Sequence, residues 1–204
     1  MATHKTWIKQ HINDPFVKKA QSEGFVSRAA YKLIQLQEKY HFIKNGMTVL
    51  ELGAAPGGWT QVIKKYVGNN GKIIALDLLP MQIHADITFI QGDFTEAETF
   101  DKLLGALNHQ KIDLVLSDMA PNLSGQKSID QPRVIYLLEL AWDCAQKVLK
   151  PGGTFLFKLF HGSGSEAFVK TLRASFKSVK WQKPEASRSK SSEVYVLAEK
   201  FLME

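Results

Sequence analysis

A lysine interrupts an apolar segment of this 204-residue chain. In GTFLFKLFHG, residues 153–162, Lys158 stands among three phenylalanines and two leucines. The run predicts a buried strand, and burying an unpaired charge costs more than the roughly 2–7 kcal/mol of a neutral polar group. Two interpretations are open: the ammonium group is held there for chemistry, or the stem packs while the head reaches water.

Acidic residues stand at the ends of other predicted strands. Asp77 ends KIIALD, Asp93 ends ITFIQGD, Asp118 ends IDLVLSD, and Glu193 opens EVYVLAEK. Open α/β sheets bind ligands at the carboxyl ends of their parallel strands, so we expect the three aspartates at one edge, close to Lys158. The alternative for the aspartates is capping of the following segment, and for Glu193 a solvated strand end.

The first predicted strand runs into a glycine-rich turn, LELGAAPGGW, residues 50–59. Glycines there let a ligand approach the backbone, which predicts a cofactor site. The spacing is not GxGxxG, because Ala55 replaces the second glycine and Pro56 removes an N–H donor, and this argues against a dinucleotide. Asp77 is suited to two ribose hydroxyls and Asp93 to an adenine amino group, although nicotinamide and S-adenosylmethionine sites share the first device.

Composition indicates one soluble globular domain, with 45% hydrophobic and 23% charged residues. The single cysteine, Cys144, excludes an internal disulfide, and the histidines show no ligand spacing, so we expect no metal. The N-terminus lacks the apolar core of a signal peptide, and no segment reaches the roughly 20 apolar residues of a membrane span. We therefore expect a cytoplasmic protein without membrane contact.

The two ends of the chain are basic. Residues 1–45 hold eight Lys/Arg against three Asp/Glu, residues 46–169 ten against thirteen, and residues 170–204 eight against four. If both ends meet in space, they form a surface suited to nucleic acid, whereas scattered solvated lysines are the simpler alternative.

Apolar strand patterns alternate with amphipathic helix patterns along most of the chain. The order favours an α/β fold with a mainly parallel seven-stranded sheet and helices on both faces. We expect a first helix from Asp14-Pro15 to Gly24 and a second helix capped by Ser27. Further helices are expected at 57–67, 98–108, 132–149 and 165–175, and strands at 48–52, 72–77, 87–93, 112–118, 154–160, 178–183 and 193–200.

Seven motifs together resemble one protein family. LELGAAPGGW, DLLPM, QGDF, SDMAPN, FKLFHG and SRSKSSEVYVL, with SRAAYKL upstream, resemble the FtsJ/RrmJ (RlmE) family of ribosomal RNA 2'-O-ribose methyltransferases over nearly the whole chain. The resemblance implies a Rossmann-like class I methyltransferase fold at residues 28–204 behind a basic extension at 1–27, and S-adenosylmethionine as cofactor. It implies a catalytic tetrad of Lys32, Asp118, Lys158 and Glu193, and cofactor contacts at Gly57, Trp59, Asp77, Asp93 and Asp118.

The reaction that the resemblance implies is 2'-O-methylation of a uridine in the A-loop of 23S rRNA, in the large (50S) ribosomal subunit. The alternative is another RNA, such as tRNA or an mRNA cap. We expect a monomer without an obligate protein partner, and phosphate contacts from basic residues near the N-terminus, giving salt-sensitive binding: Lys5, Lys9, Lys18, Lys19, Arg28 and Lys32.

A ribose hydroxyl is a poor nucleophile, so its proton must be managed. A lysine with an ordinary pKa near 10.4 is charged at pH 7; desolvation and Lys32 would lower that pKa, while Asp118 and Glu193 would raise it. Two mechanisms stay open: neutral Lys158 accepts the proton, or charged Lys158 holds the oxygen. We favour the first, with Asp118 orienting Lys158, and Lys32 and Glu193 in support.

Three rival functions follow from the same features. An oxidoreductase with a nucleotide cofactor is disfavoured by the missing GxGxxG pattern and by Pro56. A methyltransferase for another substrate class remains open, because the fold supports many. A ribosome-assembly factor without catalysis would not need the four tetrad residues, all of which are present.

Overall fold

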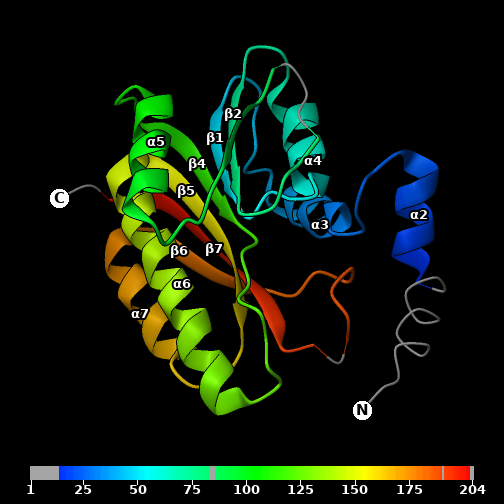
Figure 1. The fold of residues 1–204 in the computed structure, drawn as a ribbon, viewed down its shortest axis with the longest axis vertical. Helices are drawn as coiled ribbons and strands as arrows, with labels where there is room; N and C mark the ends of the chain where they lie inside the picture. The colour runs from blue at the N-terminus through cyan, green and yellow to red at the C-terminus, as the bar shows by residue number, and fades with distance from the viewer. Residues whose placement is uncertain (1–13, 83–85, 190, 203–204) are drawn as a thin grey trace.

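The structure, a computed structural model, describes residues 14–82, 86–189 and 191–202. Helices and strands alternate from residue 48 onward, as the sequence patterns predict (Figure 1). The helices are α2 (Pro15–Glu23), α3 (Ala30–Tyr40), α4 (Gly58–Val67), α5 (Ala97–Leu107), α6 (Lys127–Val148) and α7 (Ser165–Ser175). The strands are β1 (Thr48–Leu52), β2 (Lys72–Asp77), β3 (Thr88–Gln91), β4 (Ile112–Ser117), β5 (Leu149–Phe160), β6 (Phe176–Gln182) and β7 (Glu193–Phe201).

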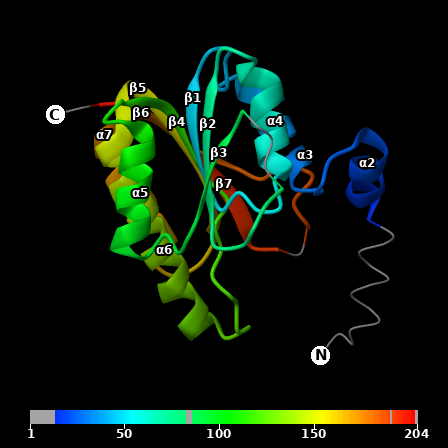
Figure 2. The same ribbon diagram turned by 45° about the horizontal axis from the view of Figure 1, so that its top comes forward.

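One seven-stranded sheet forms the centre of the molecule, in the order β3-β2-β1-β4-β5-β7-β6. Strands β1 to β5 are parallel, and β7 runs antiparallel between β5 and β6. Helices α5, α6 and α7 cover one face, and α3 and α4 cover the other (Figures 1 and 2). The predicted mainly parallel sheet with helices on both faces is confirmed.

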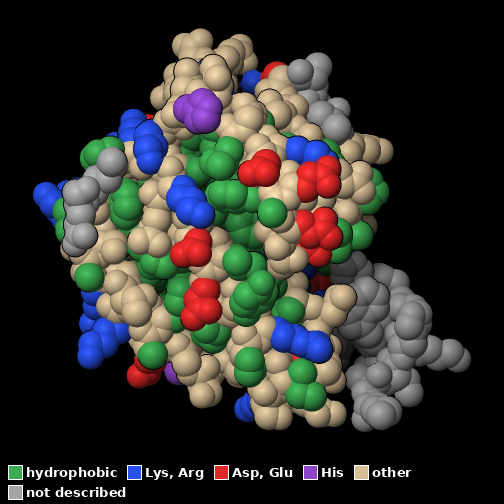
Figure 3. All heavy atoms as spheres, turned by 60° about the vertical axis from the view of Figure 1, so that its left-hand side comes forward, with side chains coloured by type: hydrophobic (Ala, Val, Ile, Leu, Met, Phe, Trp, Pro, Cys, Tyr) green, Lys and Arg blue, Asp and Glu red, His purple; other side chains and the backbone are tan. Residues whose placement is uncertain are grey.

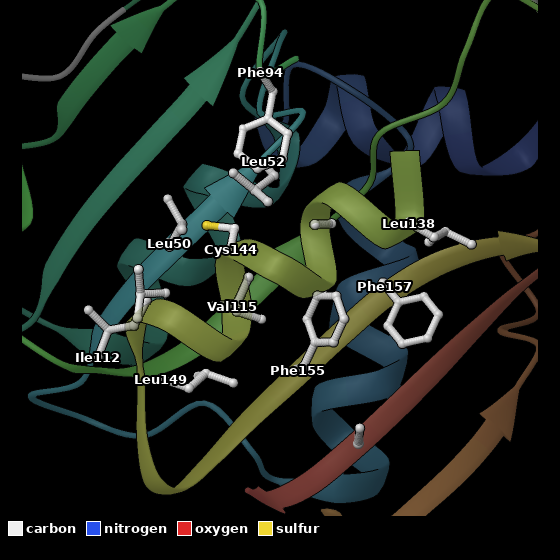
Figure 4. Packing of buried hydrophobic residues seen from close by; sticks show 14 of the residues in the cluster. Leu50, Leu52, Phe94, Ile112, Val115, Leu138, Cys144, Leu149, Phe155 and Phe157 are labelled. Atoms are coloured by element: carbon white, nitrogen blue, oxygen red, sulfur yellow. The ribbon is translucent and has the colours of Figure 1, made fainter. Parts of the chain in front are cut away.

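Both faces of the sheet are apolar because it is covered on both sides. Toward α6, side chains from β1, β4 and β5, such as Leu50, Val115 and Phe155, pack around Cys144 (Figure 4). Toward α3 and α4, the alternate residues Leu114 and Leu156 pack in a second cluster. The period of two that separates these sets is that of strand side chains, and the rigid sheet it builds fixes the strand ends that carry the acidic residues.

The start of the first helix agrees with its sequence signals. Asp14 accepts a hydrogen bond from the Phe16 N–H at 3.0 Å, Pro15 occupies the first turn, and Gly24 ends the helix in the left-handed conformation. The prediction that Ser27 caps α3 is wrong. Its hydroxyl accepts the Ala29 N–H at 3.1 Å instead, because a tight turn of i to i+3 backbone bonds precedes the helix.

Helix α6 begins five residues before the predicted start at Pro132. The proline lies inside the helix, where it leaves the carbonyl of Ser128 without its helical donor, but Ser128 is exposed to water. Asp130 secures the entry to the helix by accepting the N–H groups of Ser124 and Gly125 at 2.8 and 2.9 Å. The loop after β4 is correspondingly shorter than the sequence predicts.

Helix α2 stands outside the two helical layers, beside α3 (Figure 2). Phe16, in the first turn of this helix, and Phe25, just after its end, pack their rings on Tyr31 of α3. The ring centroids are 5.6 and 5.7 Å from that of Tyr31. The predicted basic residues Lys5 and Lys9 lie outside the described residues. Within the described part of the chain, no helix is long and apolar enough to cross a membrane, and no group of three or more His, Cys, Asp or Glu side chains could hold a metal ion.

Candidate active site

The carboxyl ends of the parallel strands bring the predicted site residues to one edge of the sheet. Asp77 is the last residue of β2, Asp93 follows β3, and Asp118 follows β4 directly. Lys158 lies two residues before the end of β5, and β4 and β5 pair in parallel register, with Ser117 beside Phe157. The expected placement of Asp118 next to Lys158 is therefore confirmed.

Lys158 is paired rather than isolated. Its Nζ lies 3.1 Å from Asp118 Oδ1 and donates a 2.5 Å hydrogen bond to the main-chain carbonyl of Asp118. The lysine side chain is 9% exposed and the aspartate 17%. These contacts rule out a head group that reaches freely into water, so the buried charge is compensated by one residue of the neighbouring strand.

Tyr195 lies beneath this pair on β7, where it is the direct neighbour of Lys158 in the antiparallel register. Its hydroxyl donates a 2.9 Å hydrogen bond to Asp118 Oδ1. The ring packs on Trp59 at 5.6 Å, and the Trp59 indole N–H donates to the Ala29 carbonyl at 2.9 Å. Burial, Asp118 and Glu193 raise the pKa of Tyr195 well above its ordinary value, so the phenol stays protonated and acts as a donor.

A second ion pair lies on the same face. Lys32 of α3 contacts both carboxylate oxygens of Glu193 at 2.7 and 2.9 Å, and the side chains are 14% and 12% exposed. Ser187 donates to the same carboxylate at 2.9 Å. Burial alone would raise the pKa of Glu193, but the ammonium of Lys32, the hydrogen bonds of Lys32 and Ser187, and the charge of Lys158 together hold it below its usual value. Glu193 is therefore ionised at neutral pH.

The two pairs form one group around Tyr195. The Lys32 ammonium lies 5.8 Å from the centre of the Tyr195 ring, whose hydroxyl bonds Asp118. Lys32 sits 126 positions before Lys158 in the sequence. Its contact with the Tyr195 ring exists because α3 packs on the sheet, where Leu33 joins Tyr195 and Leu197 in one cluster. The structure thus brings together all four residues of the predicted tetrad.

Glu51 of β1 is a fully buried carboxylate next to this edge. Thr60 donates a 2.6 Å hydrogen bond to one of its oxygens, and the other has no partner among the described residues. Burial, together with the charges of Asp118 and Asp77, raises the pKa of Glu51 to about 8, against the hydrogen bond from Thr60. Glu51 therefore keeps its proton at neutral pH, and the negative charge of this acidic cluster of Glu51, Asp77 and Asp118 comes from the two aspartates.

The predicted cofactor residues surround the turn after β1. Gly57 has φ +105°, which strains any other residue, and a Cβ there would crowd the flexible Met81 side chain, whose sulfur would lie 3.1 Å away. Asp77 accepts the N–H groups of Ala55 and Leu79, each at 2.8 Å. Next to Gly57, a pocket of about 350 Å³ opens between α4 and the segment after β2.

Two predicted cofactor residues have structural tasks in this state. The Asp93 carboxylate accepts the Thr95 N–H at 2.9 Å and the Thr95 hydroxyl at 2.7 Å, and these bonds lower its pKa. Trp59 is only 2% exposed, and its indole N–H already donates to the Ala29 carbonyl. Its backbone N–H lies in the first turn of α4, where N–H groups lack helical partners.

A small cleft of about 270 Å³ lies over the Lys32–Glu193 pair. Arg28 and Arg188 contribute to its walls. Arg28 forms an ion pair with Asp14 and donates a 2.5 Å hydrogen bond to the Ala186 carbonyl, while Arg188 is exposed. The cleft combines cationic walls with direct access to the tetrad, which suits an anionic substrate.

Sequence reasoning did not single out Tyr195, Ser187 or Glu51. Tyr195 lies in an apolar strand, where one more aromatic residue does not stand out. For Glu51 the signal was present, since an acid within the apolar run VLEL is as anomalous as Lys158 in its strand. Ser187 lies in a loop with several serines, and no spacing distinguishes it.

The chain is similar to known proteins over nearly its whole length. The sequence profile of FtsJ-like methyltransferases matches residues 25–201. A Coxiella burnetii protein named Ribosomal RNA large subunit methyltransferase E is 54% identical over 206 residues, covering 99% of this chain and 97% of the relative. An Acinetobacter baumannii protein of the same name is 54% identical over 195 residues, covering 96% and 90%.

Solved structures share the fold. A Plasmodium falciparum protein described as a ribosomal RNA methyltransferase superposes with a TM-score of 0.79 and 32% identity, over 88% of this chain and 100% of the other. Aeropyrum pernix fibrillarin, solved with natively bound S-adenosyl-L-methionine, gives a TM-score of 0.57 at 18% identity, over 83% and 75%, and supports the fold alone. On the profile match and the identity with full-length relatives, the chain belongs to the family of FtsJ-like methyltransferases.

Proposed function

We propose that this protein transfers a methyl group from S-adenosylmethionine to the ribose 2'-oxygen of a uridine in the A-loop of 23S rRNA. The observation that carries the proposal is the geometry of Lys158, which is almost buried, 3.1 Å from Asp118 and next to the Lys32–Glu193 pair. The names of relatives that are 54% identical over nearly the full chain support an rRNA substrate from the large subunit.

The acidic cluster of Glu51, Asp77 and Asp118 fits S-adenosylmethionine, whose sulfonium and ammonium groups are positive. Glu51 has one buried oxygen without a partner in the described part of the chain, and Asp77 and Asp118 lie close enough to raise its pKa. In the proposed site, Gly57 and the Trp59 N–H lie along the ligand, Asp77 receives the ribose hydroxyls and Asp93 the adenine amino group. The cofactor, when bound, supplies an electrophilic methyl group on a sulfonium sulfur.

The chain's own part in the reaction is to position the ribose oxygen and take its proton. Lys158 comes from a rigid strand, and its head group is fixed by two contacts to Asp118. In the proposed mechanism neutral Lys158 accepts the proton, Asp118 orients it, and Tyr195 holds Asp118 in place. Lys32 and Glu193 fix the substrate side of the site, where the cleft above them opens.

RNA binding is assigned to the basic residues around that cleft. Arg28 and Arg188 line it. Lys18 and Lys19, on α2, are exposed and precede Arg28 closely in the sequence. Phosphate contacts of this kind give affinity that falls with salt, without reading sequence. Base identity would then be read from a splayed single-stranded loop.

The decisive experiment incubates the protein and labelled S-adenosylmethionine with intact large subunits, protein-free rRNA and tRNA, and maps the methylated ribose. Methylation of one A-loop uridine, absent with Lys158→Ala, is the expected result. Methylation confined to tRNA or capped mRNA would replace the substrate and keep the enzyme class. Label in the base rather than the ribose would overturn the proposed reaction.

We further propose that the protein acts as a cytoplasmic monomer, with residues 1–27 as an RNA-binding extension of the methyltransferase domain. Sedimentation equilibrium over a wide concentration range tests the monomer. Deletion of residues 1–13, which retains Asp14 and its pair with Arg28, tests the extension: we expect weaker RNA binding with a shallower salt dependence. Unchanged binding would remove these residues from the interface.

A further inference from the structure

A groove of about 620 Å³ lies at the far edge of the sheet, between α7 and the strands β6 and β7. It is separate from the pocket beside Gly57 and from the cleft over the Lys32–Glu193 pair, because neither of these shares a lining residue with it. Trp181, Val194 and His161 line it. They point to the face of the sheet that packs on α6 and α7, opposite the face that carries Lys158 and Tyr195.

The walls of this β6–α7 groove are positively charged. Lys170 and Arg173 lie three residues apart on the exposed side of α7, and Lys183 follows β6. Lys183 donates hydrogen bonds to the carbonyls of Ser189 and Ser191 at 3.3 and 2.7 Å, which leave its charge uncompensated.

The groove contains one carboxylate, Glu166, against these three cations. In the described part of the chain, neither Lys170 nor Arg173 takes part in an ion pair. Figure 3 shows the side of the molecule that lies to the left in Figure 1. Over its centre, acidic and basic side chains are interspersed, unlike the cations of the groove. A local excess of unpaired cations suits an anionic partner.

The groove also has an aromatic wall. Trp181, on the edge strand β6, is half-buried, and its ring lies 5.6 Å from the ring of exposed His161 at an angle of 42°. An accessible ring beside lysine and arginine is the combination with which proteins hold single-stranded nucleic acid, since bases stack on the ring while cations contact phosphates. An acidic peptide would use the cations but not the ring.

The groove is linked to the candidate active site through the end of β5. His161 follows β5 directly, and its N–H donates a 2.9 Å hydrogen bond to the Ser192 carbonyl, beside Glu193. At roughly 3.3 Å per strand residue, His161 lies about 10 Å along the chain from Lys158. RNA held in the groove would therefore lie close to the target nucleotide.

We propose that the β6–α7 groove binds RNA that flanks the target nucleotide, with phosphates at Lys170 and Arg173 and a base on Trp181. The inference rests on the proposed function, because it assigns a second contact to the same rRNA. The RNA would then pass over the carboxyl ends of the β-strands, with its target ribose at Lys158 and its flank held on the opposite face of the sheet. The protein would thereby select targets with an unpaired flank.

The first test measures RNA affinity against salt for Lys170→Gln/Arg173→Gln. Each lost phosphate contact reduces the slope of log affinity against log salt by about 0.7 on a single strand, so we expect a decrease of about 1.4. Lys44→Gln/Lys72→Gln is the matched control, because both lysines are exposed near the amino-terminal ends of β1 and β2, strands that do not line the groove, and it should keep the slope of the unmodified protein. Equal slopes for both double variants would overturn the proposal.

The stacking contact is tested at Trp181. Trp181→Phe keeps an aromatic face and Trp181→Leu removes it, while both keep an apolar side chain against the core. We expect the leucine variant to bind on the order of tenfold more weakly and the phenylalanine variant to bind almost normally. Equal affinities, with equal unfolding free energies, would remove the base from the groove.

Tethered cleavage identifies the occupant. Cys144 is the single cysteine and is 1% exposed, so an iron chelate on Ala174→Cys, next to Arg173 on exposed α7, reports on this groove alone. Cuts in rRNA close to the methylated nucleotide are the expected result, and none from Lys44→Cys. Cuts in a ribosomal protein without cuts in rRNA would overturn the RNA assignment.

The same materials separate the two proposals. If the unmodified protein methylates the A-loop uridine and the groove variants bind and cleave as the controls do, only the groove assignment fails. If the unmodified protein neither binds nor methylates rRNA or large subunits, the proposed function fails, and the groove assignment with it.

Discussion

The Tyr195 hydroxyl and the Lys158 ammonium share one oxygen of Asp118. The first donates to it at 2.9 Å and the second lies 3.1 Å away. A carboxylate oxygen with two donors is fixed in position, and its charge is divided between them. The position of the lysine head group therefore depends on a phenol that reaches Asp118 from β7.

Tyr195→Phe tests this arrangement. The variant keeps the packing on Trp59 and removes one hydrogen bond to a charged group, a contribution of about 1.5–3 kcal/mol. Asp118 then loses one of the two donors that fix it, so Lys158 is held less firmly against the ribose oxygen. We expect turnover to fall on the order of tenfold, which single-turnover rates at saturating cofactor and RNA measure. A normal rate together with a normal unfolding free energy would contradict the role of the phenol.

Replacement of Lys158 separates the two mechanisms. Lys158→Ala should lower turnover by at least ~10²-fold if the amine accepts the proton. Lys158→Arg keeps a positive charge that cannot be removed near neutral pH, so it should lose as much. Single-turnover rates at saturating cofactor and RNA measure both. An arginine variant close to the unmodified rate would favour a charged group that only holds the oxygen.

The Lys32–Glu193 pair is predicted to matter for both stability and activity. Removal of one partner, as in Lys32→Met, leaves a largely buried charge unpaired, which typically costs about 3–5 kcal/mol of unfolding free energy. Lys32→Met/Glu193→Met removes both charges and should recover most of that loss. Because the substrate side of the site is still missing, activity should stay low in all variants. Recovery of activity with stability would make the pair structural only.

The fold could be predicted from local patterns because each element repeats its own signal. Short, nearly continuous apolar runs mark the strands of a sheet covered on both faces, and Asp14, Pro15 and Gly24 mark the ends of α2. The sheet edge could be predicted as well, since parallel strands place their last residues together. For this reason Asp77 and Asp118 were expected where they lie.

The rest depends on contacts between distant parts of the chain. Lys32 meets Glu193, 161 positions away, and the family resemblance, not any local pattern, paired them. Tyr195 becomes a functional candidate only when β7 inserts between β5 and β6. Pro132 was expected to start a helix, but the exposure of Ser128 to solvent and the hydrogen bonds to Asp130 allow α6 to begin earlier. Such balances are set by the environment and not by the residue itself.

Glu51 provides the prediction for pH. Burial raises its pKa from an ordinary 4.5 to about 8, so between these values the folded protein keeps a proton that the unfolded chain releases. Its contribution to the unfolding free energy is therefore fully present below about pH 4.5 and is lost as the pH rises toward 8. The total is on the order of a few kcal/mol.

Glu51→Gln should remove this dependence. The amide stays neutral at every pH and still offers an oxygen to Thr60, which donates to Glu51 in the unmodified protein. Urea unfolding at pH 5 and at pH 8 measures the effect: the variant should gain stability over the unmodified protein at pH 8 and much less at pH 5. Glu38→Gln, at an exposed position on α3, is the control and should leave the dependence unchanged. If the Glu51 variant and the unmodified protein lost stability in parallel between pH 5 and pH 8, the Glu51 carboxyl would already be ionised at pH 5. The charge of the acidic cluster would then come from Glu51 as well as from Asp77 and Asp118.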